Sequence, residues 1–244
     1  MALIRLENLS FSYKKKKEEI KVLDNISIEF ESNKIHVILG KSGSGKTTLL
    51  KCINGLHDYH GHVFYDDINY DNVPVKDRKL GYISQEFGLY PHFDLFKSIS
   101  YPLVISGVDT LEIRRRVEEI TSELDIKEIL SRKPKQVSIG QAQRAALARA
   151  LIKRPGVCLF DEPLSNLDAL HRQEIRHYIK KTLTKYSCTG IYVTHDLKEA
   201  TAIGDYIHLL DDGKIVASGL VNDIIFSSNP KVREFFDSLK DEAI

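Results

Sequence analysis

Two hydrophobic periods alternate along the chain. Short apolar runs and strict apolar–polar alternation indicate strands, whereas apolar residues three or four positions apart indicate helices. The first pattern predicts strands at residues 3–7, 20–30, 34–39, 62–65, 80–84, 157–160, 190–194, 206–210 and 214–217. The second predicts a helix starting near residue 48, helices at 111–124, 141–153, 170–185 and 197–203, and two short helices after residue 217. Because strands alternate with helices, we expect an α/β fold with a mostly parallel sheet.

The alternation is interrupted once. From about residue 87 to 140 the pattern is helical throughout, which indicates an inserted helical subdomain of about 87–153 once the next helix is included. We expect one domain over 1–244, with a core of about 1–86 and 154–244 and an N-terminal antiparallel β subdomain. Turns are expected at the lysine run 14–17 and at 211–213, Asp-Asp-Gly, which is a strong hairpin signal.

The most specific local motif is a glycine-rich loop between the strand at 34–39 and a helix start. It reads Gly-Lys-Ser-Gly-Ser-Gly-Lys-Thr-Thr and fits the phosphate-binding pattern G-x-x-x-x-G-K-[ST] of a P-loop NTPase. Glycines let backbone N–H groups converge on phosphate oxygens at a helix N-terminus. The motif predicts that Lys46 reaches the terminal phosphates and that the Thr47 hydroxyl binds Mg²⁺. The candidate nucleotide-binding residues are Gly40, Lys41, Ser42, Gly43, Ser44, Gly45, Lys46, Thr47 and Thr48.

A second apolar run ends in two acids, Asp161 and Glu162. On a buried parallel strand these residues emerge at the carboxyl end, where ligands of open α/β sheets bind. We expect Asp161 to hold Mg²⁺ and Glu162 to polarise the water that attacks the γ-phosphate. An apolar run that ends in two acids more often marks a strand end with solvated acids. The phosphate-binding loop upstream favours a catalytic role for these two acids here.

Residues 137–151 carry a more specific resemblance. They read Val-Ser-Ile-Gly-Gln followed by an Arg/Ala-rich helix, which is similar to the signature L-S-G-G-Q of the ATP-binding subunits of ABC transporters. The resemblance implies that Ser138, the Gly140 backbone and Gln141 bind the γ-phosphate of ATP held by an opposite subunit, so that two subunits sandwich two ATP molecules. Ile139 stands where the family has glycine, and this departure implies reduced but retained activity.

Other residues match the family in order. The resemblance implies that Tyr13 stacks on adenine, that Gln85 touches Mg²⁺ and the attacking water, and that His195 is the switch histidine at the γ-phosphate. Residues 165–168, which end in Asp168, resemble the loop that couples the two subunits' sites. The implied cofactors are ATP and Mg²⁺. The implied partners are a second ATP-binding subunit, in a homodimer, together with transmembrane permease subunits and a solute-binding protein, at the cytoplasmic face of the cell membrane.

Several segments favour the importer branch. Residues 89–92, 100–103 and 162–169 resemble importers of maltose and related solutes, which usually carry an extra C-terminal β domain. Residues 229–236 resemble shorter branches, which include phosphonate, sulfonate, nitrate and lipid-trafficking systems. Import is therefore favoured and the cargo stays open. The alternatives are a short-chain lipid-trafficking or export ATPase, a DNA-repair or translation ATPase, which would carry coiled coils or two ATPase cores, and a binding-only regulator, which only Ile139 encourages.

Bulk properties agree with a transport ATPase. Lys and Arg number 35 and Asp and Glu 34, so the net charge of +1 argues against nucleic-acid binding. Cys52 and Cys158 lie in apolar runs, so we expect buried, reduced thiols and an intracellular location. No segment reaches the roughly 18 apolar residues of a membrane span, and Arg5 and Glu7 argue against a signal peptide. Any membrane link would come through a partner.

Three clusters are assigned structural or surface roles. They are the histidines His57, His60 and His62, the acids Asp66, Asp67 and Asp71, and the run Arg114–Arg116. The histidines lack a convincing fourth metal ligand. The acids lack the terminal acid of a calcium loop and predict a solvated hairpin.

Overall fold

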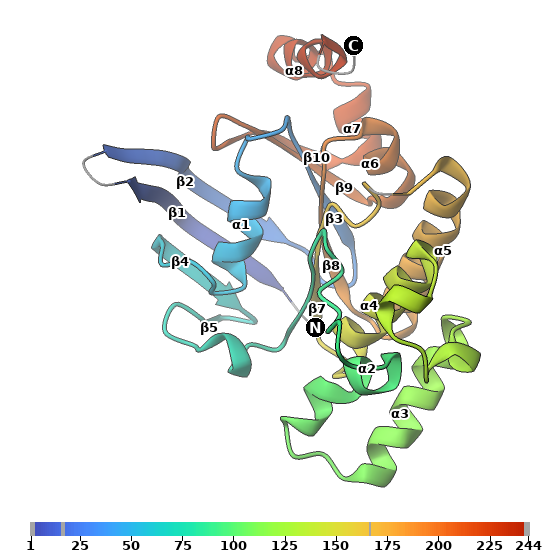
Figure 1. Ribbon diagram of the computed structural model, residues 1–244. Coiled ribbons are helices and arrows are strands. Elements are labelled where there is room, and N and C mark those ends of the chain that lie inside the picture. The colour runs from blue at the N-terminus through green and yellow to red at the C-terminus, as the bar shows by residue number, and fades with distance from the viewer. Residues whose placement is uncertain (1–2, 16–17, 166, 242–244) are drawn as a thin grey trace. The chain divides into compact units, whose positions relative to one another are not determined.

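A computed structural model describes residues 3–15, 18–165 and 167–241 (Figure 1). The chain forms two compact units. The first unit consists of residues 1–80 and 189–244, and the second consists of residues 81–188. The expected helical segment 87–153 lies inside the second unit, which also contains the strand that ends in Asp161 and Glu162.

The first unit contains a four-stranded antiparallel sheet in the order β2-β1-β4-β5. Its strands are β1 (Ile4–Lys15), β2 (Glu18–Phe30), β4 (His60–Tyr65) and β5 (Ile68–Asn69). β1 extends well beyond the predicted strand at 3–7 because a bulge interrupts its alternation: Asn8 has a positive φ of 52°, and the pairing register shifts between Leu6 and Leu9. Lys15 lies opposite Glu18, and residues 16–17 of the expected turn lie outside the described residues.

The first unit also contains the parallel strands expected of the core. β3 (Ile35–Leu39) pairs in parallel with β8 (Thr189–Thr194) and β9 (Tyr206–Asp211), and β10 (Lys214–Leu220) pairs antiparallel with β9. Every residue of β3 and β8 is buried. Asp212 and Gly213 both have positive φ, as a type I′ turn requires, so the predicted hairpin is confirmed.

Helices complete the first unit. They are α1 (Lys46–Ile53), α6 (Leu197–Ile203), α7 (Val221–Ile225) and α8 (Pro230–Asp241), with a 3₁₀ turn η1 (Val75–Asp77). α1 begins at Lys46, two residues before the predicted start, because the loop ends in the left-handed Gly45. The two short helices expected near the end are α7 and α8.

The second unit is mostly helical. It contains β6 (Leu80–Ile83), β7 (Val157–Asp161), α2 (Leu95–Val104), α3 (Thr110–Glu123), α4 (Ile139–Leu151), α5 (Ala169–Lys185), and the 3₁₀ turns η2 (Lys127–Ile129) and η3 (Pro134–Gln136). α4 was predicted at 141–153, but it begins and ends two residues earlier because Ser138 caps its N-terminus. α5 likewise begins one residue early behind the cap Asp168.

Two further observations bear on the sequence predictions. None of the helices in the described part of the chain combines the length and apolar character that a bilayer crossing needs. Cys52, Cys158 and Cys188 are all buried, as expected for the first two. Burial raises the pKa of the Cys52 and Cys188 thiols to about 12.

Candidate functional site

The loop between β3 and α1 is built on glycine. Gly43 and Gly45 adopt φ values of 80° and 102°, in the left-handed region that favours glycine. A Cβ at Gly40 would lie 2.5 Å from the Leu210 carbonyl oxygen, so a larger residue there would displace backbone. These constraints shape a tight loop in front of the N-terminus of α1.

Lys46 lies inside this loop. Its side chain is buried, and Nζ donates to the Gly40 carbonyl at 3.0 Å and the Lys41 carbonyl at 2.7 Å. The N-cap of α1 is Gly45, which offers no side-chain cap to the first N–H groups of the helix. The buried Ser44 Oγ has no hydrogen-bond partner among the described residues. An ammonium, a helix N-terminus whose N-cap is glycine and a buried hydroxyl together suit a multivalent anion.

Two other predicted residues lie in the first unit. His195 is exposed and follows β8 directly, and the Thr194 carbonyl before it accepts the Gly40 N–H at 3.3 Å. The histidine segment is therefore joined to the phosphate-binding loop by a backbone hydrogen bond. Tyr13 is 43% exposed, which leaves much of its ring open to a ligand. Its ring meets Phe11 edge-on at 4.8 Å between centroids, and its hydroxyl lies 3.3 Å from His57 Nε2.

The acid pair lies in the second unit at the carboxyl end of β7, as the sequence predicted. Asp161 is buried and accepts a hydrogen bond from the Tyr82 hydroxyl at 3.0 Å. Burial, and next the Asp161 charge, raise the pKa of Tyr82, so its hydroxyl stays protonated and donates. Glu162 is half-buried and has a φ of 45°. A non-glycine residue held in this region is strained, and such strain is typical of functional sites.

The signature segment begins α4 in the second unit. Ser138 is the N-cap: its Oγ accepts the Gln141 N–H at 3.2 Å, and Gln141 Oε1 accepts the Ser138 N–H at 3.0 Å. Ile139 follows with 54% of its surface exposed, and Gly140 is buried. The isoleucine that departs from the family pattern therefore extends into solvent within this unit.

The remaining predicted residues lie at loop ends of the second unit. Gln85 is exposed in the turn after β6. Asp168 is exposed at the N-cap of α5, where it accepts the His171 N–H at 3.0 Å. Asn166 of the coupling segment lies outside the described residues.

Comparison with known proteins decides the family. The family model described as ABC transporter matches residues 23–165, which is more than half of the chain. The chain belongs to the ABC transporter family.

The relatives of this ABC transporter chain include import proteins. It is 39% identical over 220 residues to a maltose/maltodextrin import ATP-binding protein of Vibrio cholerae, covering 90% of this chain and 58% of the relative. It is 40% identical over 230 residues to a glucose import ATP-binding protein of Saccharolobus solfataricus, covering 92% and 65%. The chain thus spans about three fifths of the length of these relatives.

A solved structure matches over nearly its full length. The dimeric post-hydrolysis state of the ATP-binding cassette MJ0796, bound to ADP and Pi, has a TM-score of 0.80 and 30% identity, and covers 89% of this chain and 98% of that one. An ABC cassette with a P-loop α/β fold is therefore confirmed.

Three residues of this ABC cassette were missed by sequence reasoning. They are Tyr82, which bonds Asp161; Gln143, which donates from α4 to the Pro163 carbonyl; and Glu199, a buried acid on α6. A polar residue on the apolar face of a helix could have drawn attention to Gln143 and Glu199. No sequence signal connects Tyr82 to an acid 79 positions away.

The clusters given structural roles make contacts of their own. His62 Nδ1 lies 2.7 Å from Asp71 Oδ2, and His57 stacks on Phe11 with centroids 4.7 Å apart. Asp66 and Asp67 both have positive φ and form the turn between β4 and β5, which confirms the hairpin.

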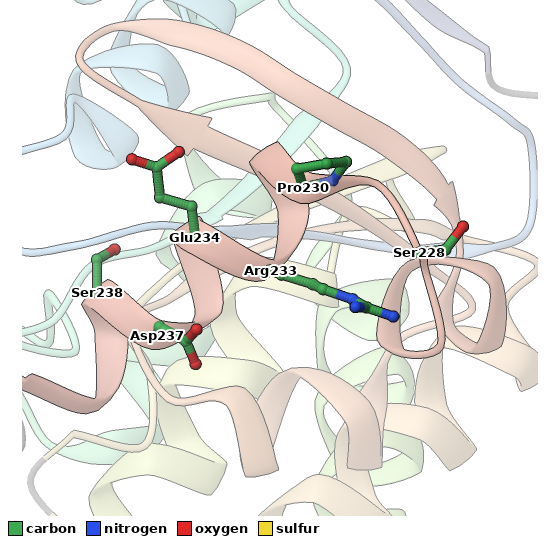
Figure 2. A pocket seen from close by; sticks show the side chains of 6 residues that line it. All are labelled: Ser228, Pro230, Arg233, Glu234, Asp237 and Ser238. Atoms are coloured by element: carbon green, nitrogen blue, oxygen red, sulfur yellow. The ribbon is translucent and has the colours of Figure 1, made fainter.

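An open concavity lies away from these residues. It is a hollow of about 550 Å³ along the start of α8, and Figure 2 shows the side chains that line it. Its lining residues are Ser228, Pro230, Arg233, Glu234, Asp237 and Ser238. None of the predicted site residues is among them, so the hollow contributes nothing to the candidate site.

Proposed function

We propose that this chain is the ATP-hydrolysing subunit of an ABC transporter that imports a small solute. The phosphate-binding loop supports this most directly, because it holds the buried Lys46 ammonium and the orphaned Ser44 hydroxyl. Import is favoured because relatives with about 40% identity are named as import ATP-binding proteins.

In the proposed mechanism the loop N–H groups and Lys46 bind the β- and γ-phosphates and offset their charge, while Tyr13 stacks on the adenine. Thr47, Asp161 and Gln85 would hold Mg²⁺, whose bound charge stabilises the phosphate oxygens. Asp161 is suited to this role because it is buried with a hydroxyl donor. Glu162 polarises the attacking water and His195 donates a hydrogen bond to the γ-phosphate.

A second copy would complete each site. We propose that Ser138, Gly140, Gln141 and Asp168 act on the nucleotide held by the opposite subunit. The exposed start of α4 supports this, since Ser138 and Ile139 face solvent in one chain. The matching cassette structure is described as dimeric.

The further partners are permease subunits in the membrane and a solute-binding protein. We place the chain at the cytoplasmic face of the membrane, bound through the permease. Residues 87–153 are proposed as the helical subdomain that takes part in this coupling. The cargo would be selected by the permease and the solute-binding protein.

The decisive experiment measures Mg-ATP hydrolysis by the wild-type chain and by Glu162→Gln. We expect a loss of ~100-fold or more in kcat, because a positioned general base contributes at least that much. The matched control is Glu234→Gln, an exposed glutamate on α8, which should hydrolyse ATP at the wild-type rate. Equal rates for Glu162→Gln and wild type would remove Glu162 from its role.

The same Glu162→Gln variant tests the pairing. With Mg-ATP it should elute as a dimer in size-exclusion chromatography with light scattering, and as a monomer without nucleotide. A chain that stayed monomeric at saturating Mg-ATP would contradict the proposed second subunit.

A further inference from the structure

A closed ring of hydrogen bonds joins the two residues that flank His195, Thr194 and Asp196, to Glu199. Thr194 Oγ1 donates to Glu199 Oε2 at 2.8 Å, and the Glu199 N–H donates to Asp196 Oδ1 at 3.2 Å. The Asp196 N–H donates to Thr194 Oγ1 at 3.0 Å, which closes the ring. The residues immediately before and after His195 are both members of the ring, so the histidine backbone is held from both sides.

Glu199 closes the ring from inside the protein. It is 6% exposed, on the first turn of α6. Its other carboxylate oxygen, Oε1, accepts a hydrogen bond from the Tyr192 hydroxyl, and Tyr192 is fully buried on β8. A buried carboxylate is costly unless donors satisfy it, and here two hydroxyl groups from the same strand do so. A carboxylate at this position therefore joins α6 to the end of β8, directly before His195.

The Thr194 hydroxyl takes part in two bonds of this ring. It donates its hydrogen to Glu199 and accepts from the Asp196 N–H. The Thr194 backbone carbonyl separately accepts the Gly40 N–H of the phosphate-binding loop at 3.3 Å. One residue thus connects the ring, the histidine segment and the start of that loop, all within the first unit.

We propose that Glu199 is a positioning residue for His195, acting through the Thr194 hydroxyl to fix the direction in which the histidine leaves β8. This inference rests on the proposed function, because it gives His195 its role at the γ-phosphate. Glu199 itself is buried and touches no substrate. Its contribution is to limit the motion of an exposed side chain, and displacement of about 1 Å at a reacting group can cost up to ~100-fold in rate.

The test opens the ring with Thr194→Val, which keeps the β-branched shape and removes the hydroxyl. Thr194→Ser keeps the hydroxyl and is the conservative rescue. Thr201→Val is the matched control, since the Thr201 hydroxyl on α6 bonds only the Lys198 carbonyl of its own turn in the described contacts. Each variant is compared in kcat, in the Kd for ATP, and in the NMR resonance of the His195 imidazole in nucleotide-free protein labelled at its nine histidines. His195→Asn assigns that resonance.

We expect Thr194→Val to lower kcat by ~10-fold with the Kd for ATP within about 3-fold of wild type, and to shift or broaden the His195 resonance. Thr194→Ser and Thr201→Val should retain wild-type values in all three measurements. Glu199→Ala removes the carboxylate that accepts from the Thr194 hydroxyl, and it replaces Thr194→Val if circular dichroism shows that Thr194→Val is unfolded.

An unchanged His195 resonance and unchanged kcat in the ring-opened variant would overturn the proposal. A loss in kcat that Thr194→Ser fails to restore would overturn it as well, because the hydroxyl would then not be the cause. If the wild-type chain hydrolyses no ATP, the proposed function fails, and the resonance in nucleotide-free protein still decides whether the ring positions His195.

Discussion

Two helix N-termini in this chain are suited to phosphate and they are built in opposite ways. α1 begins behind glycine: its N-cap Gly45 has no side-chain acceptor, and its first residue, Lys46, is buried. α4 begins behind a capping box, in which Ser138 and Gln141 satisfy each other's N–H groups, and its first residue, Ile139, is 54% exposed.

The difference teaches how the two ends should bind. The N-cap of α1 is a glycine and supplies no side-chain cap, so an anion at this end competes with no capping side chain of that residue. The donors of α4 are partly satisfied already, so a phosphate must compete with the Ser138–Gln141 bonds. The first end should therefore bind nucleotide in a single chain, and the second should contribute only when a nucleotide is presented by another subunit.

The largest expected effect comes from breaking the first end. Lys46→Ala removes the ammonium that the loop carbonyls hold, and a charged hydrogen bond contributes about 1.5–3 kcal/mol. We expect the Kd for ATP to rise by ~10- to 100-fold, measured by isothermal titration calorimetry. Lys51→Ala, in the last turn of the same helix, is the control. A wild-type Kd for Lys46→Ala would remove the contrast between the two ends.

Acid pH should lower the stability of the first unit, which contains the N-terminus of α1, and should leave the N-terminus of α4 in the second unit unaffected by the histidine pair His36 and His208. His36 lies on β3, the strand that leads into the phosphate-binding loop. Its Nδ1 lies 3.0 Å from Nε2 of His208 on β9. The outer nitrogens lie 3.0 Å from the Glu31 carbonyl and 3.0 Å from the Ser218 hydroxyl. The carbonyl only accepts, so His36 donates to it and accepts from His208, and both rings are neutral with every nitrogen used. A proton added to either ring would place a positive charge on this buried pair, and burial disfavours that charge.

The sign of the effect follows from linkage. Burial, and next the neighbouring His36, lower the pKa of His208 to about 3 from its ordinary 6.5, and burial also lowers the pKa of His36. The unfolded chain binds the proton below pH 6.5 and the folded chain does not until about pH 3, so stability is present above pH 6.5 and lost as pH falls. Two acids near His36 reduce this loss of stability, because the Glu31 and Asp205 charges raise the pKa of His36. The Lys34 charge acts in the opposite direction and lowers it.

At pH 5 we expect His208 alone to remove roughly 2 kcal/mol from the free energy of unfolding. Urea titrations at pH 7.5 and pH 5 measure this loss. His208→Gln should lose less between the two pH values, whereas His177→Gln, an exposed histidine on α5, should behave as wild type. The same pH slope in His208→Gln and wild type would show that the buried pair is not responsible.

A smaller effect is expected at the second end. Ser138→Ala removes the cap of α4, which should cost about 1 kcal/mol of stability. ATP binding to the single chain should be unaffected, while steady-state hydrolysis falls. Asp109→Ala is the control, because Asp109 caps α3 through the Leu111 N–H at 2.8 Å and should cost similar stability without slowing hydrolysis. Weakened ATP binding in monomeric Ser138→Ala would contradict the division between the two ends.

The smallest effect concerns the departure from the family pattern. Ile139→Gly restores glycine and removes an exposed side chain, so stability should fall by about 0.5 kcal/mol through helix propensity. Removing bulk from the phosphate-facing end should raise kcat, by less than ~3-fold since the change is below 0.7 kcal/mol. A thermal melt and an ATPase assay, with Ile139→Ala as the intermediate variant, measure both. A fall in kcat would show that the isoleucine assists turnover.

Features set by local rules could be predicted from the sequence. The glycines before Lys46 predict a loop with left-handed backbone, and residues 211–213 predict a type I′ turn. Both need a positive φ, which few residues other than glycine, asparagine and aspartate adopt. The positions of Asp161 and Glu162 at the end of β7 were predictable for a similar reason, since an apolar run that stops at acids marks a strand end.

Features that depend on tertiary contacts could not be predicted. The bulge at Asn8 hid most of β1, because it moves apolar residues out of strict alternation. The Tyr82–Asp161 bond joins two residues that are 79 positions apart, so their spacing in the sequence carries no meaning until the chain folds. The start of α4 was missed for a different reason: the capping box of Ser138 and Gln141 is local, but the prediction followed only the Ala/Leu-rich stretch and began the helix two residues late.

The burial of the cysteines has a practical consequence for spectroscopy. All three thiols are buried, and burial raises the pKa of each, so thiolate is scarce at neutral pH and alkylating dyes should react slowly with the native protein. A cysteine introduced at the exposed Ile139 position would then be labelled selectively against a silent background. A fluorophore there could report, in real time and with all three native cysteines kept, when the N-terminus of α4 of one molecule meets the nucleotide of another.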